Sequence, residues 1–241
     1  MIPNLREKCG VVGIFVPNEE VSRLTFFSLY ALQHRGQECA GIASFSSDKI
    51  HVHADMGLVA QVFNEEIINS LKGNFAIGHT RYSTTGASSS INAQPLIVES
   101  DMGTIAVAHN GNIVNADTIR YELEKQDVSF KTSSDTEVLT QLIVNGTGNT
   151  WEEKIESMMR KVEGAYSLTI LVKDAIYAVR DSHGIRPLSI GKLNDGWFIA
   201  SETCALDHIG AEYIRDVNPG EIVRIDKSGL DSYQGIEPKE N

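Results

Sequence analysis

A cysteine near the start of the chain carries the most reactive side chain in the sequence. Cys9 opens an apolar run that continues to Val16. Its thiol is a nucleophile, and a cut just before Cys9 would free an α-amine that could accept the thiol proton. The ordinary pKa values of the two groups, about 8.5 and about 7.7–8.0, lie close to working pH. The alternative is a buried structural cysteine at the beginning of a strand.

Four other segments are polar where a plain core strand would be apolar. They are residues 32–38 (LQHRGQE), 78–84 (GHTRYST), 108–112 (AHNGN) and 132–137 (TSSDTE). Scattered histidines do not suggest zinc, because no cysteine or carboxylate stands at ligand spacing from them. These histidines are His51, His53, His79 and His109. We therefore predict no metal site, and we expect Cys39 and Cys204 to be packed in the core.

Short β-like runs predict most of the elements that must position these residues. They are residues 10–16, 40–45, 50–55, 75–81, 105–109, 166–172, 176–180, 188–190, 197–200 and 221–225. Residues 194–196 (NDG) predict a hairpin turn, because Asn, Asp and Gly tolerate positive φ. Helices are predicted over 21–33 and 117–126, and capping boxes at 134–137 and 150–153 begin two more.

The order of these elements favours an α+β fold with stacked antiparallel sheets covered by helices. A doubly wound parallel sheet would need a crossover helix between most consecutive strands, and the pattern has none. The polar segment after Ile225 is predicted to be frayed.

Composition limits the class of protein. The chain has 241 residues, of which 41% are hydrophobic, so one large domain fits as well as two. No run approaches the roughly 18 apolar residues of a membrane span, and no signal region precedes Cys9. The three cysteines suit a reducing cytoplasm, and the net charge of −11 argues against nucleic acid and anionic membranes. No Gly-rich phosphate loop is visible, so no cofactor is predicted.

The ordered set of Cys9-Gly10 and the four polar segments resembles the glutaminase domain of the class II glutamine amidotransferases. The resemblance covers residues 8 to about 225 and implies a four-layer αββα sandwich, the fold of N-terminal-nucleophile (Ntn) hydrolases. Within the family, residues 32–38, 184–189 (GIRPLS) and 200–205 (ASETCA) are similar to the phosphoribosylpyrophosphate amidotransferase branch of purine synthesis.

The resemblance implies which residues carry out the chemistry. Cys9 would be the nucleophile, and its freed α-amine the general base. Asn110 and Gly111 would form the oxyanion hole, through a side-chain amide and a backbone N–H. The alternative for Asn110-Gly111 is an ordinary turn, since Asn-Gly is a common turn pair.

The resemblance also implies a clamp for the two charged ends of glutamine. Arg81 would bind the α-carboxylate through two parallel hydrogen bonds, and Asp135 would bind the α-ammonium. Dipole compensation at a helix N-terminus is the simpler explanation for Asp135. Arg35 and Thr84 match family positions around the same pocket, and Tyr82 matches one near them. An ion pair is the usual explanation for an isolated arginine.

The sequence departs from the family pattern at both ends. Cys9 is not terminal, so residues 1–8 are expected to be a leader removed by cleavage between Lys8 and Cys9, through attack of the Cys9 thiol on the preceding carbonyl. Residues 9–241 are expected to form the glutaminase domain, with no phosphoribosyltransferase domain after it. The acceptor of the ammonia would then be a separate subunit or the remainder of a longer enzyme.

The predicted function is therefore hydrolysis of L-glutamine to glutamate and ammonia through a γ-glutamyl thioester on Cys9, with the ammonia used to form phosphoribosylamine. A phosphoribosyltransferase partner and a homo-oligomer are expected. Two alternatives stay open: an Ntn hydrolase for another amide, and a silent regulatory or scaffold subunit with the same fold.

Overall fold

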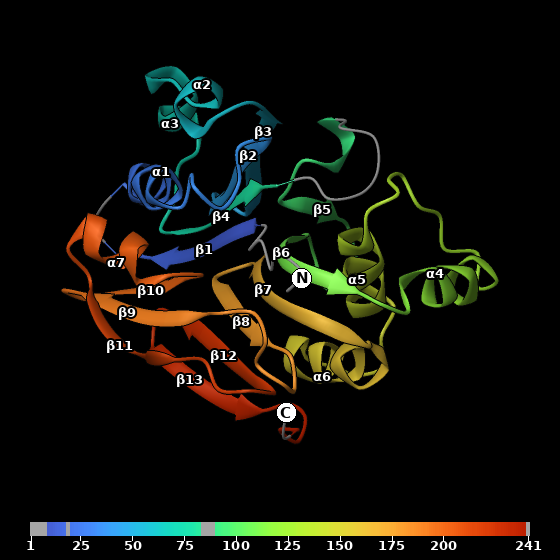
Figure 1. Cartoon of the computed structure of the whole chain (residues 1–241). Coiled ribbons are helices and arrows are strands. Elements are labelled where there is room, and N and C mark those ends of the chain that lie inside the picture. Colours follow the sequence, from blue (N-terminus) through green and yellow to red (C-terminus); the bar gives the residue numbers. More distant parts are fainter. Residues whose placement is uncertain (1–8, 18–19, 83–89, 240–241) are drawn as a thin grey trace, which may run out of the picture.

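The computed structural model describes residues 9–17, 20–82 and 90–239. Two antiparallel sheets are stacked face to face, and helices cover the outer face of each (Figure 1). This four-layer αββα arrangement confirms the predicted α+β fold.

The first sheet has seven strands and contains the nucleophile candidate. In spatial order they are β11 (Glu212–Asp216), β9 (Ser189–Leu193), β10 (Gly196–Ala200), β1 (Cys9–Phe15), β4 (Phe75–Arg81), β2 (Cys39–Ser46) and β3 (Lys49–Met56). Its outer face is covered by four short helices. They are α1 (Val21–Ala31), α2 (Val59–Val62), α3 (Glu65–Ser70) and α7 (Thr203–Ile209).

The second sheet has six strands and contains Asn110 and Gly111. In spatial order they are β13 (Gly229–Gln234), β12 (Glu221–Asp226), β8 (Ala175–Arg180), β7 (Gly164–Val172), β6 (Ile105–Ile113) and β5 (Leu96–Val98). Three helices cover its outer face. They are α4 (Ala116–Glu124), α5 (Asp135–Val144) and α6 (Trp151–Lys161). A 3₁₀ turn, η1 (Ser90–Asn92), precedes β5.

The alternation of side chains along β1 shows how one strand serves two layers. Val11 and Phe15 belong to the apolar cluster between the sheets, whereas Val12 and Ile14 pack in the cluster beneath the helices of the first sheet. Successive side chains of a strand point to opposite faces, so a strand buried on both faces must be apolar at every position. This requirement explains the continuous apolar run after Cys9.

Local sequence signals were confirmed where they rest on neighbouring residues. Asn194 has a φ of 51° in the two-residue turn between β9 and β10. The capping box of α6 is present, because Thr150 accepts from the N–H of Glu153 and the Glu153 carboxylate accepts from the N–H of Thr150. These signals act within three residues, so the remainder of the fold need not be known to recognise them.

Three predictions about local structure were wrong. Residues 134–137 do not form a capping box: Ser134 accepts from the N–H of Thr136, and the Glu137 carboxylate turns back to the N–H groups of Lys131 and Thr132. The segment after Ile225 is not frayed, because β13 pairs with β12 from Gln234 to Gly229. The predicted helix over 21–33 ends at Ala31.

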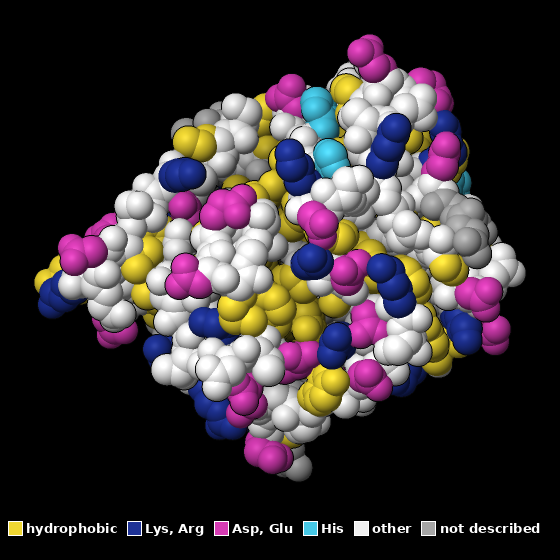
Figure 2. Space-filling model, turned by 180° about the vertical axis from the view of Figure 1, so that it is seen from behind, with side chains coloured by type: hydrophobic (Ala, Val, Ile, Leu, Met, Phe, Trp, Pro, Cys, Tyr) yellow, Lys and Arg dark blue, Asp and Glu magenta, His cyan; other side chains and the backbone are white. Residues whose placement is uncertain are grey.

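No helix among the described residues is long and apolar enough to cross a membrane. On the face shown in Figure 2, the described Lys and Arg side chains are interspersed with Asp and Glu. This face therefore offers no uniformly basic surface of the kind that attracts nucleic acid.

Candidate active site

Cys9 lies at the first position of β1, where three of the polar segments meet. Its partner in β4 is Arg81, and Arg81 also pairs with Cys39 at the start of β2. Cys9 is half-buried. Burial raises the pKa of its thiol to about 11, although a hydrogen bond with the Tyr82 backbone and the charges of Arg81 and Arg35 oppose this rise. The uncut chain therefore keeps the thiol protonated at neutral pH.

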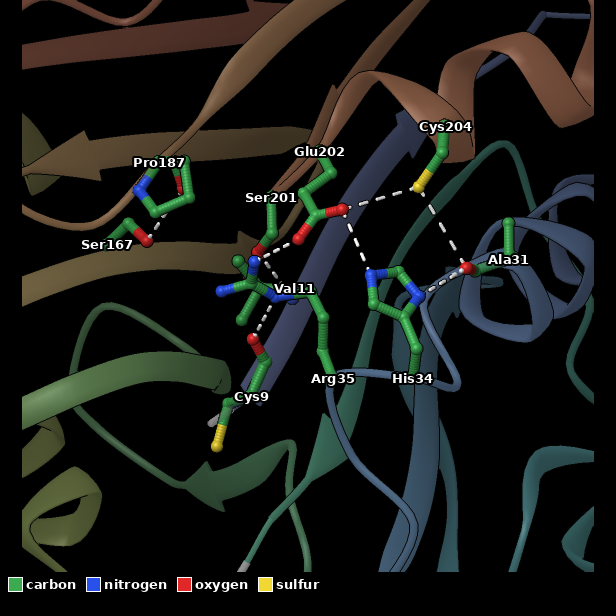
Figure 3. A network of polar contacts seen from close by, with 10 residues as sticks. All are labelled: Cys9, Val11, Ala31, His34, Arg35, Ser167, Pro187, Ser201, Glu202 and Cys204. Atoms are coloured by element: carbon green, nitrogen blue, oxygen red, sulfur yellow. Dashed lines mark hydrogen bonds and ion pairs between the residues drawn. The ribbon is translucent and has the colours of Figure 1, made fainter. Parts of the chain in front are cut away.

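The side chain of Arg35 forms a hydrogen bond with the backbone of Cys9. Its Nε donates to the Cys9 carbonyl oxygen at 2.7 Å, and its Nη1 donates to Oε1 of Glu202 (Figure 3). Arg35 is 2% exposed and the side chain of Glu202 is 34% exposed, so this ion pair is partly buried. The carboxylate of Glu202 has a lowered pKa: its burial would raise the value, and the hydrogen bonds and charges of Arg35 and His34 outweigh that effect.

A glycine lets the loop of Arg35 approach β4. A Cβ at Gly36 would lie 2.6 Å from the backbone nitrogen of Arg81. No side chain fits there, so glycine permits the contact between this loop and the strand that carries Arg81.

Asn110 and Gly111 lie within β6, so the alternative that they form a turn is wrong. They pair with Ser167 and Tyr166 of β7. Asn110 is 1% exposed, and its Nδ2 has no hydrogen-bond partner among the described residues. A Cβ at Gly111 would lie 2.1 Å from the carbonyl oxygen of Ala165, so only glycine fits. Nδ2 of Asn110 is therefore free of competing acceptors among the described residues.

Two histidines connect the oxyanion-hole candidates to the first sheet. His79 of β4 donates from Nε2 to the carbonyl oxygen of His109, the residue before Asn110, at 3.1 Å. Burial lowers the pKa of His79 to about 3, so its ring stays neutral and keeps one N–H for this bond. The bond fixes Asn110 relative to Arg81, two residues beyond His79 in the same strand.

Asp135 is the first residue of α5 and is tied to β6. Its Oδ2 accepts from the N–H of Ile113 at 3.2 Å, and its Oδ1 lies 3.6 Å from Nδ1 of His109. Burial would raise the pKa of this carboxyl, but His109 and the N–H groups of Ile113 and Thr136 outweigh burial and lower it. Asp135 therefore stays ionised, and its charge is felt at the Cys9 thiol.

A network of hydrogen bonds connects β6 with α5 and was missed by the sequence analysis. Oε1 of Gln94 accepts from the N–H of His109 at 2.8 Å, and Nε2 of Gln94 donates to Oγ1 of Thr136 at 2.9 Å. Ser201 similarly accepts from the N–H of Val11 at 2.9 Å. His109, Thr136 and Ser201 lie in polar segments that the sequence analysis had noted, whereas no sequence signal pointed to Gln94.

The structure brings most of the predicted site residues together. Cys9, Arg35, Arg81 and Asp135 lie close enough for their charges to act on one thiol. Nη1 of Arg81 is buried and has no hydrogen-bond partner among the described residues. Thr84 and Lys8 lie outside the described residues. The start of β1 therefore brings together a nucleophile, an arginine and a carboxylate.

Ligand-type side chains gather at a place that the sequence analysis did not consider. His34, Glu202 and Cys204 form a group of three whose ligand atoms all lie within 4.8 Å of one another, among the described residues. The prediction for Cys39 was confirmed, because it is 1% exposed. The prediction for Cys204 was confirmed in part: it packs against the apolar cluster under α1 and α7 but is only partly buried, and its sulfur lies 3.6 Å from Oε2 of Glu202.

The fold is that of the N-terminal-nucleophile hydrolases. Residues 79–208 match the glutamine amidotransferase domain family. The chain belongs to the class II glutamine amidotransferases.

The similar proteins are amidophosphoribosyltransferases. The chain is 49% identical over 237 residues to that of Synechococcus elongatus, covering 96% of this chain and 48% of the relative. It is 48% identical to amidophosphoribosyltransferase 1, chloroplastic, of Arabidopsis thaliana, covering 97% of this chain and 41% of that protein. The structure of glutamine phosphoribosylpyrophosphate amidotransferase from B. subtilis complexed with ADP and GMP is 42% identical, with a TM-score of 0.89. Coverage is 95% of this chain and 49% of that one. The chain thus spans about half the length of these relatives.

Proposed function

We propose that this chain hydrolyses L-glutamine to glutamate and ammonia, with Cys9 as the nucleophile. The observation that carries the proposal is two buried donors that have no hydrogen-bond partner among the described residues. They are Nη1 of Arg81, the strand partner of Cys9, and Nδ2 of Asn110 in β6. Each such donor costs about 1–3 kcal/mol when it has no acceptor. An amide substrate with an α-carboxylate supplies an acceptor for each.

The first half of the reaction forms a thioester. The Cys9 sulfur attacks the γ-carbonyl carbon of glutamine, and the negative charge that develops on the carbonyl oxygen is stabilised by Asn110 Nδ2 and the N–H of Gly111. The C–N bond then breaks, and the leaving nitrogen takes a proton to depart as ammonia. Water attacks the γ-glutamyl thioester in the second half, which releases glutamate and restores the thiol.

Arg81 and Asp135 suit an amino acid at the other end of the substrate. The guanidinium of Arg81 binds the α-carboxylate, and the ionised carboxylate of Asp135 binds the α-ammonium. Arg35 serves as a positioning residue, because it already donates to the Cys9 carbonyl and pairs with Glu202. Thr84 completes the pocket in this proposal.

We propose further that residues 1–8 are a leader, that cleavage between Lys8 and Cys9 frees the general base, and that residues 9–241 are the glutaminase domain. The ammonia goes to a phosphoribosyltransferase domain or subunit and forms phosphoribosylamine for purine synthesis. The names of the relatives and their double length support this assignment. A reducing cytoplasm as the location, and a homo-oligomer as the assembly, belong to the same proposal.

The purified chain should release ammonia from glutamine and, without an added acceptor subunit, form no phosphoribosylamine from phosphoribosyl pyrophosphate. A glutamine-analogue electrophile should add its mass to the peptide that contains Cys9. Labelling of Cys39 or Cys204 instead would overturn the assignment of the nucleophile. Faster hydrolysis of another amide would favour a different Ntn hydrolase, and absence of any hydrolysis by leader-free protein would favour a silent scaffold.

Replacement of Arg81 by lysine should raise KM for glutamine while leaving kcat within a few-fold. A lost hydrogen bond to a charged group costs about 1.5–3 kcal/mol, which corresponds to roughly tenfold to hundredfold in KM. Initial rates over a range of glutamine concentrations measure both constants. Arg23→Lys is a matched control, because Arg23 forms an exposed ion pair with Glu65 on the outer surface. A loss confined to kcat would place Arg81 in the chemical step instead.

A further inference from the structure

The C-terminal end of α1 and the beginning of α7 bring three metal-ligand side chains to one point of the surface. His34 follows α1, and Glu202 and Cys204 stand on either side of the first residue of α7 (Figure 3). Nε2 of His34 lies 3.0 Å from Oε2 of Glu202, and Sγ of Cys204 lies 3.6 Å from the same oxygen. We propose that His34, Glu202 and Cys204 form a binding site for a divalent transition-metal ion of the zinc class.

The spacing of the three ligand atoms fits tetrahedral zinc. Bonds of about 2.0–2.1 Å to nitrogen and oxygen and about 2.3 Å to sulfur place neighbouring ligand atoms roughly 3.3–3.6 Å apart. The separations of Oε2 of Glu202 from Nε2 of His34 and from Sγ of Cys204, 3.0 and 3.6 Å, lie close to this range. The remaining two atoms, Nε2 of His34 and Sγ of Cys204, lie within 4.8 Å of each other. A small rotation of the His34 ring would shorten this distance to that of a tetrahedral site.

Hydrogen bonds already orient the His34 and Glu202 side chains for an ion. Nδ1 of His34 donates to the carbonyl oxygen of Ala31 at 3.1 Å, so Nε2 is the ring nitrogen that faces Glu202, and an ion would replace the Nε2 proton there. A backbone carbonyl on the second ring nitrogen is the usual support of a metal-bound histidine. Oε1 of Glu202 is held by Arg35, so Oε2 is the oxygen that faces His34 and Cys204.

The donor set selects the class of ion. A thiolate disfavours Mg²⁺ and Ca²⁺, which prefer oxygen, whereas a carboxylate disfavours Cu⁺, which prefers sulfur. One sulfur, one nitrogen and one oxygen suit Zn²⁺ and its spectroscopic substitute Co²⁺. The His34 side chain is 57% exposed and that of Glu202 34%, so an ion can enter from solvent and keep water as its fourth ligand.

Cobalt titration of tag-free protein tests the site. Cys9→Ser serves as the background, because the Cys9 thiol could also take an ion. We expect one equivalent of Co²⁺ per chain, with a thiolate-to-cobalt charge-transfer band that zinc abolishes by displacement. Cys204→Ser in this background should remove the band, and His34→Gln should weaken binding by more than about tenfold, the lower limit for loss of a supporting partner. His53→Gln, on the distant strand β3, should change neither.

Circular dichroism and thermal melting of each variant should match the background protein. A second measurement needs no variant at position 204: stoichiometric zinc should protect Cys204 from alkylation, as read by peptide mass spectrometry. A band that survives Cys204→Ser, unchanged affinity in His34→Gln, or equal alkylation with and without zinc would each overturn the proposal.

Discussion

Protein that retains residues 1–8 should hydrolyse glutamine about 10²–10⁴-fold more slowly than protein that begins at Cys9. While Lys8 is attached, the nitrogen of Cys9 is an amide and cannot accept the thiol proton, and a positioned general base contributes about that factor. The thiol cannot compensate, because burial raises its pKa to about 11. At pH 7, four units lower, only about one thiol in 10⁴ is ionised.

The pH dependence should separate the two forms. In uncut protein the thiolate fraction rises about tenfold per pH unit until pH approaches the pKa of about 11, so alkylation of Cys9 should rise in the same way. In protein that begins at Cys9, activity should already level off near the pKa of an α-amine, about 7.7–8.0.

The effect of the leader can be measured in preparations that differ in the fraction of protein lacking residues 1–8. In each preparation, intact mass gives that fraction and is compared with specific activity. A chain starting Met-Cys9 should become active once its methionine is removed. Cys9→Ala should abolish hydrolysis and, if cleavage uses the Cys9 thiol, retain residues 1–8. Full activity in protein that retains residues 1–8 would contradict the role of the Cys9 α-amine as the general base.

Replacement of Asn110 by alanine should lower kcat by about 10²–10³ with little change in KM, since loss of one oxyanion donor costs roughly 2.7–4 kcal/mol in the transition state. The ground state should lose little, because an oxyanion-hole donor acts mainly on the negative charge that develops on the carbonyl oxygen in the transition state. Steady-state kinetics give both constants.

Asn112→Ala is the matched control for Asn110→Ala. Asn112 lies two residues further along β6 and is exposed, so its replacement should leave kcat and the melting temperature nearly unchanged. Near-normal kcat in Asn110→Ala would remove Asn110 from the oxyanion hole, and a collapsed melting temperature would assign it a structural role in β6 instead.

The sequence by itself determined the features that depend on near neighbours. The hairpin at Asn194 and the cap at Thr150 were recognisable because positive φ and N-cap hydrogen bonds involve residues within three positions. The ordered polar segments also predicted that Cys9, Arg81 and Asp135 belong to one site, and the structure places the charges of Arg81 and Asp135 near the Cys9 thiol.

Only the tertiary structure decided how these residues support one another. Arg35 and Glu202 are 167 positions apart, and His79 and His109 are 30 apart, yet each pair forms a contact at the site. The pattern also missed β13, whose polar strand is stabilised by pairing with β12. The periodicity of apolar residues predicts which face of an element is buried. Which other elements that face contacts depends on the strand order and on how the two sheets pack. The sequence predicted core packing for Cys204 but not its place beside His34 and Glu202. The position of α7 against α1 is set by packing between segments distant in sequence.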